Sequence, residues 1–336
     1  MTKDSKKGRG IYLLLIFFIG IFLLSFSLGR YPIDPITLLK ILFSRIITIN
    51  KTWTDVMETV VFEIRLPRIL GAVLVGAALS VSGVVYQSMF KNPLVSPDIL
   101  GVSAGAAFGA ALAIFFSFSS LGIQLSAFAF GLAGVALVYL ISLRIKGDPI
   151  TSLVIMGILV GSIFSSLTSL IKYLADTDSK LPAITFWLMG SLSGVNFKAL
   201  SKVLLPMAVA FIPLYLLRWR LNVLSLSEEE AKSLGLDTRK LRALVILCSS
   251  LLTASAVSIS GVIGWIGLVI PHVARMLVGS DHKVLLPASM LLGASYLLLV
   301  DNISRALTTV ELPLGILTAL IGAPFFIFLM LQKERF

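Results

Sequence analysis

The sequence has few residues of the kinds that build disulfides, metal sites or catalytic centres. Its 336 residues include one cysteine, Cys248, and two histidines, His272 and His282. A lone cysteine inside an apolar segment excludes a disulfide framework and a cysteine metal site. No carboxylate or cysteine stands at metal-ligand spacing from either histidine, and the tripeptide 281–283 suits a solvated turn. We therefore expect no metal, no cofactor and no enzymatic activity.

Energy-coupling motifs are also missing. No GxxxxGK[ST] phosphate loop occurs, so the chain cannot hydrolyse ATP through that motif. The middles of the apolar segments are almost free of ionisable residues, whereas ion-coupled carriers place proton or sodium relays there. Asp301 and Arg305 stand four residues apart near one segment end, where they suit a local ion pair. A transporter built this way must take its energy from a partner.

Hydrophobic residues, by contrast, dominate the composition. They make up 57% of the chain and charged residues only 13%, far from the balance of a soluble domain. Repeated apolar stretches of eighteen or more residues predict an all-α, polytopic membrane protein, with 1–336 as one transmembrane domain. The net charge of +11 then reflects basic cytoplasmic loops rather than a nucleic-acid partner.

Ten membrane spans can be placed along the chain. The eighth is the weakest because GWIGLVIPHVARMLVG is short and contains Pro271 and Arg275. Such segments are tolerated where protein rather than lipid surrounds them. The predicted spans are 11–29, 66–90, 97–118, 121–143, 150–174, 200–217, 242–262, 264–279, 285–305 and 312–331.

Basic residues near the span ends favour both termini on the cytoplasmic side of the cell membrane. The N-terminal apolar run is too long for a signal peptide and has no cleavage site, so we interpret it as the first span. Residues 30–61 and 175–199 then lie outside, and 218–241 forms the largest internal loop.

Two further patterns concern helix packing. The segments ALSVSGVV (78–85) and AVSISGVI (256–263) match closely and would run in opposite directions, as in the inverted repeats of transporters. Chance similarity between small-residue helix faces is the alternative. Gly101, Gly105 and Gly109, like the 157/161 glycine pair, would let helices approach closely in a compact bundle.

The internal loop contains SEEEAKSLGL, 227–236. Ser227 and Glu230 match a capping box that starts a helix, and Gly235 suits its end. A short cytoplasmic helix is predicted, either an ordinary surface helix or the docking element for an energy-supplying partner.

The stretch RLPRILGAVLVGAALSVSGVVYQSMFKNPLVSPDILGVSAGA resembles the signature of the FecCD family of ABC-transporter permeases. Segments of the second half of the chain also resemble this family, namely SISGVIGWIGLVIPHVARMLVGSDHKVLLP, DNISRAL and ELPLGILTALIGAPFFIFLM. The resemblance implies a type II ABC importer permease fold with ten helices per subunit, working as a homodimer. It also implies two ATPase subunits on the cytoplasmic side and a binding protein outside.

The resemblance implies roles for particular residues. ATPase coupling in this family uses the loop between the sixth and seventh spans, here 218–241. We therefore assign ATPase contact to the short predicted helix, through Glu228, Ala231, Leu234 and Gly235.

Docking of the binding protein is assigned to Arg65, Arg68 and Arg305, since similar permeases pair outer arginines with acidic residues on that partner. As flexible, exposed side chains they would gain about 0.2–1 kcal/mol per pair. The alternative is that Arg65 and Arg68 snorkel to lipid headgroups while Pro67 occupies a first helical turn.

Substrate identity stays open. The family carries iron(III)–siderophores, haem and cobalamin, and in a few cases an oxyanion such as molybdate; family frequency favours an iron complex. The alternative from another functional class is a stand-alone secondary carrier. The lack of ionisable proton or sodium relays in the middles of the spans argues against it. An intramembrane enzyme would need a catalytic cluster in the bundle, and none is assembled in the sequence.

Overall fold

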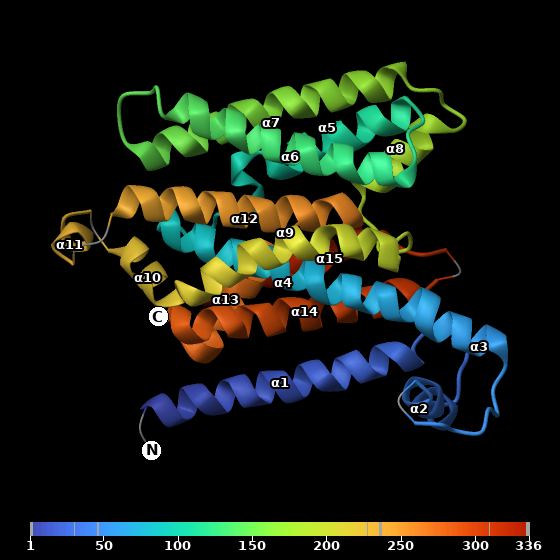
Figure 1. The fold of residues 1–336 in the computed structure, drawn as a ribbon. Coiled ribbons are helices and arrows are strands. Elements are labelled where there is room, and N and C mark those ends of the chain that lie inside the picture. Colours follow the sequence, from blue (N-terminus) through green and yellow to red (C-terminus); the bar gives the residue numbers. More distant parts are fainter. Residues whose placement is uncertain are drawn as a thin grey trace.

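Long apolar helices run side by side through the molecule (Figure 1). The computed structural model describes residues 3–29, 31–45, 47–226, 228–234, 237–308 and 310–333, and it has no strand in these ranges. Each predicted span has one helix as its counterpart, so the all-α prediction is confirmed. These helices are α1 (Lys3–Ser27), α4 (Leu66–Met89), α5 (Val102–Phe115), α6 (Ser120–Ser142), α7 (Pro149–Leu174), α9 (Phe197–Leu216), α12 (Thr238–Ser260), α13 (Ile266–Val278), α14 (His282–Ala306) and α15 (Leu314–Lys333).

Among the described residues, seven helices are long and apolar enough to cross a membrane, and three apolar helices are shorter. The shorter apolar stretches are α5, α13 and Leu314–Leu329 of α15. The predicted span 97–118 is divided because a 3-10 turn, η2 (Pro97–Leu100), precedes Gly101, whose φ is +78°. A left-handed φ suits glycine and ends the turn before α5 begins. The expected weak eighth span is α13, which has 13 residues.

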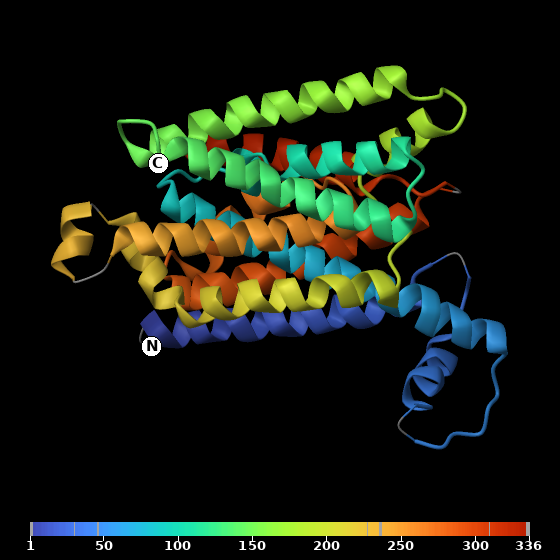
Figure 2. The same cartoon turned by 45° about the horizontal axis from the view of Figure 1, so that its top comes forward.

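Short elements gather at the two ends of the bundle. The helices α2 (Pro35–Phe43), α3 (Asp55–Thr59) and α8 (Lys180–Leu188) lie at one end. The opposite end carries α10 (Arg218–Leu221), the 3-10 turn η3 (Asn222–Ser225) and α11 (Glu228–Ser233). Figure 2 also shows both chain termini at the α11 end. We call these two ends the α3 end and the α11 end.

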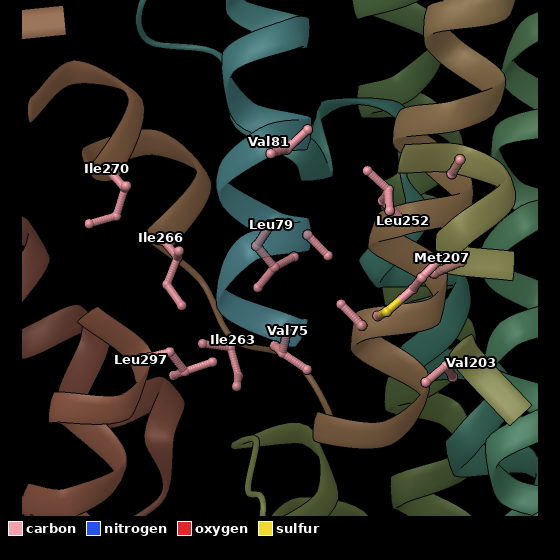
Figure 3. Close-up of a cluster of buried hydrophobic side chains, with 14 of the residues drawn as sticks. Val75, Leu79, Val81, Val203, Met207, Leu252, Ile263, Ile266, Ile270 and Leu297 are labelled. Carbon is pink, nitrogen blue, oxygen red and sulfur yellow. The ribbon is translucent and has the colours of Figure 1, made fainter. Parts of the chain in front are cut away.

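Helix α4 occupies the centre and is buried over most of its length. Its side chains, such as Val75 and Leu79, pack among apolar side chains of neighbouring helices (Figure 3). Close approach depends on glycine. A Cβ on Gly83 would lie 1.9 Å from the carbonyl oxygen of Gly267 in α13. The first matching segment lies within α4, and the second covers the end of α12 and the three residues after it; α4 and α12 run in opposite directions (Figure 1).

A continuous helix leads from the α3 end into α4. It runs from Asp55 to Met89 and includes one π-helical stretch, η1 (Val60–Arg65). Within η1 the Leu66 N–H donates to the Val61 carbonyl, five residues back. Pro67 lacks an N–H, and its ring clashes with the carbonyl four residues earlier in a regular α-helix. The wider π turn accommodates Pro67 and fixes the direction in which Arg65 leaves the helix.

Candidate functional site

A buried ion network joins α4 to α14 at the α3 end. The Nε atom of Arg68 donates to Asp301 Oδ1 at 2.9 Å, and Nη1 donates to both carboxylate oxygens of Glu311 at 2.9 Å. On the other side of Asp301, Arg305 Nε lies 3.1 Å from Oδ2. Asp301 is fully buried. Removing one member of such a buried network leaves an uncompensated buried charge, which is costly.

Arg65 and Arg305 bind backbone carbonyls at the carboxyl end of α1 and just after it. Arg65 donates to the carbonyls of Phe26 and Tyr31, and Arg305 donates to Leu28 O at 3.2 Å. The last carbonyls of a helix have no intrahelical partner and form the negative end of its dipole. Two guanidinium groups therefore fix the end of α1 against α4 and α14.

The structure thus brings the three predicted docking arginines together, although Arg305 is far from the other two in sequence. Their exposed fractions are only 3% for Arg65, 5% for Arg68 and 7% for Arg305. The expectation of exposed, flexible side chains is therefore wrong, because intramolecular carboxylates and carbonyls occupy their donors. Neither burial nor bonding tests the docking role, which stays a prediction.

A second polar group lies at the α11 end, and sequence reasoning missed it. His282 begins α14 and is 4% exposed, so the expected solvated turn at 281–283 is wrong. The Nε2 atom of His282 lies 2.6 Å from Ser88 Oγ of α4, and Nδ1 lies 2.7 Å from Asn222 Oδ1 of η3. The Asn222 amide also donates to Asp281 at 3.0 Å. These bonds tie the 218–241 segment directly to α4 and α14.

The predicted coupling helix is present as α11, which begins at Glu228. Ala231 is 1% exposed and faces the protein, whereas Leu234 is 60% exposed. Gly235 lies outside the described residues, as does Ser227, the first residue of the predicted capping box. Leu234 is the one residue of this set that the structure describes with an exposed apolar side chain, and the ATPase contact stays a prediction.

Asp237 fixes the return of the chain into α12. It is the N-cap residue, and its carboxylate accepts the backbone N–H groups of Arg239 and Lys240 at 3.1 Å. The hydrogen bond from the Lys240 amide holds the pKa of Asp237 below its ordinary value. Since the charged form caps the helix better, the start of α12 is stable at neutral pH.

No cofactor chemistry is indicated by the described residues. They contain no group of three or more His, Cys, Asp or Glu that could hold a metal ion. Cys248 is free and buried within α12. The two polar groups instead join α4 to α14 at both ends of the bundle.

A bundle of ten apolar helices, some of them short, with a small projecting helix has the architecture of a membrane-transport permease. The model of the FecCD transport family matches residues 14–332. The chain therefore belongs to the FecCD transport family, whose similarity to this sequence extends over nearly all of it.

Individual relatives agree over similar lengths. The chain is 46% identical to the molybdate import system permease protein MolB of Haemophilus influenzae, covering 100% of this chain and 98% of that one. It is 45% identical to a probable iron chelatin transport system permease protein of Helicobacter pylori, covering 83% and 84%. A solved structure described as an inward-facing conformation of a metal-chelate type ABC transporter superposes with a TM-score of 0.87. It is 45% identical, and 97% of this chain and 99% of that chain are covered.

Proposed function

We propose that this chain is the membrane subunit of a binding-protein-dependent ABC importer that uses ATP hydrolysed by separate subunits. The observation that carries the proposal is the full-length match to a permease family, together with a projecting helix at one end. The proposed assembly is a homodimer with two ATPase subunits and one binding protein. The α11 end faces the cytoplasm in this proposal, which agrees with the basic loops and with both termini at that end.

For the cargo we propose a molybdate-type oxyanion. The supporting observation is similarity to a molybdate permease over the whole chain. The second candidate is an iron(III)–chelate, or a related haem or cobalamin cargo, supported by relatives such as the Helicobacter pylori permease. Both candidates need the same partners, so they differ only in what is carried.

Transport by reconstituted protein tests the proposal. The permease and its ATPase are incorporated into proteoliposomes, and uptake of radiolabelled molybdate and of an iron(III)–siderophore is measured with the cognate binding protein. We expect uptake that requires both ATP and the ATPase. Uptake driven by a proton gradient alone would contradict an ABC importer, and uptake of iron chelate without molybdate would select the second cargo.

The exposed end of α11 gives a prediction about ATPase coupling. We expect Leu234→Asp to lower ATPase co-purification roughly tenfold, because a charge replaces an exposed apolar anchor. Ser233→Asp changes an exposed neighbour to the same charge, so it serves as the control and should retain the ATPase. Equal losses in both variants would assign the effect to charge alone.

Glu311 offers a direct test of the docking arginines. An acidic residue of a binding protein can reach Arg68 Nη1 only by replacing Glu311, whose side chain is 27% exposed. We expect Glu311→Gln to tighten binding-protein association two- to fivefold, the size of one partly exposed ion pair. The control is Asp55→Asn, which removes a carboxylate at the same end of the molecule. The Asp55 side chain is 93% exposed and is paired with Lys51. If both variants bind alike by surface plasmon resonance, Arg68 takes no part in docking.

A further inference from the structure

A cavity of about 760 Å³ opens at the α3 end, away from the arginine network. Its walls come from the starts of α6 and α9, from α8 and from the end of α12. Most of the wall is apolar, including Leu121 and Phe186. The polar part carries amides, hydroxyls and two lysines, and none of the lining residues is Asp or Glu. A basic cavity without a carboxylate favours an anionic occupant.

The two lysines of the cavity wall are both exposed and lie on the same helix. Lys198 and Lys202 stand four residues apart on α9, so their side chains share one helix face, where like charges destabilise the helix. Neither ammonium group has a hydrogen-bond or ion-pair partner in the described ranges. By contrast, Lys51 is paired with Asp55 and Glu58. An anion between Lys198 and Lys202 would supply the missing counter-charge.

The amide of Asn196 adds a third donor. Its Oδ1 atom accepts the Ala199 backbone N–H at 2.9 Å, as the N-cap of α9. Because Oδ1 accepts this bond, the Nδ2 group of Asn196 points away from the helix. Both of its N–H groups can then donate to an occupant of the cavity. The Gln124 side chain of α6 donates to the Ala199 carbonyl of α9 at 3.1 Å, which ties these two walls together. The cavity therefore has unoccupied donors and fixed walls.

We propose that this cavity binds a tetrahedral oxyanion through Lys198, Lys202 and Asn196. Two sources share this chemistry, a free oxyanion and the phosphate of a lipid headgroup whose acyl chains would lie along the apolar wall. Only the choice of molybdate as the free anion rests on the function proposed above. A free anion would make the cavity an entry site for cargo, and a lipid would make it a structural site.

Equilibrium dialysis of radiolabelled molybdate against the purified full-length permease tests the site without ATP or partners. The Lys198→Gln/Lys202→Gln protein should bind about tenfold more weakly or worse, since charge-assisted hydrogen bonds are lost. The control, Lys40→Gln/Lys172→Gln, removes the same charge from the same end outside the cavity and should bind within about twofold of the unmodified protein. Melting curves check that all three proteins are folded.

A second arm separates the two sources. The proteins are placed in nanodiscs of phosphatidylcholine with or without phosphatidylglycerol, and bound lipid is counted by native mass spectrometry. Retention of phosphatidylglycerol by the unmodified protein and the control, but not by the cavity variant, assigns the site to a lipid phosphate. If neither molybdate nor phosphatidylglycerol distinguishes the cavity variant from the control, the proposal is overturned. Binding without ATP-driven molybdate uptake would keep the site and reject the proposed cargo.

Discussion

The Asp301→Asn protein is expected to lose about 3–5 kcal/mol of stability, the cost of removing one partner from a buried ion pair. Asp301 is fully buried between Arg68 and Arg305, with nitrogen–oxygen distances of 2.8 Å and 3.1 Å. The amide keeps the shape of the carboxylate but leaves two buried guanidinium groups with one carboxylate, Glu311. Chemical unfolding in detergent, followed by tryptophan fluorescence, measures the change.

Two comparisons decide whether charge is the cause. Glu311→Gln should cost about 1 kcal/mol or less because Glu311 is partly exposed and water screens its pairing. The Arg68→Met/Asp301→Leu/Arg305→Met triple variant should be less destabilised than Asp301→Asn, since it replaces all three buried charges, and apolar replacement of a whole buried ion triad is often neutral. A triple variant that is the less stable of the two would contradict this explanation and assign the network a net stabilising role.

The second large effect is expected at the crossing of α4 and α13. Gly83→Val should abolish monodisperse protein, because even a Cβ would lie 1.9 Å from the Gly267 carbonyl oxygen. Backbone atoms cannot move aside as a flexible side chain can, so the helices must separate. Gly83→Ala should cost at least about 1–3 kcal/mol, the usual range for overpacking. Size-exclusion profiles and melting midpoints in detergent report both changes.

Gly161 of α7 is the matched control, since a Cβ there meets no atom within 4 Å. Gly161→Ala should be neutral or should stabilise the protein by up to about 1 kcal/mol, because alanine is the better helix former. Gly157, one turn earlier, is different: its Cβ would lie 2.0 Å from the Ile99 carbonyl oxygen. Equal tolerance of alanine at 83 and 161 would contradict a glycine-dependent crossing.

The sequence by itself determined the ten apolar helices and nearly all of their positions. Hydropathy is a local property, and a membrane requires backbone hydrogen bonds to be made within each span. Residue types also located the weakest span, α13, and the short helix α11. The resemblance of the chain to one permease family, carried by RLPR and the segments after it, needed no structure.

Only the tertiary structure decided what those residues contact. Arg68 bonds Asp301 and Glu311, which are more than two hundred residues away, and His282 bonds Ser88 and Asn222 on two other elements. Sequence spacing can pair groups on one helix, as it did for Asp301 and Arg305. Sequence spacing cannot identify a partner on a distant helix. That partner depends on which helices pack together and on how closely their glycines let them approach. The arginines that looked exposed at a membrane boundary are buried for this reason.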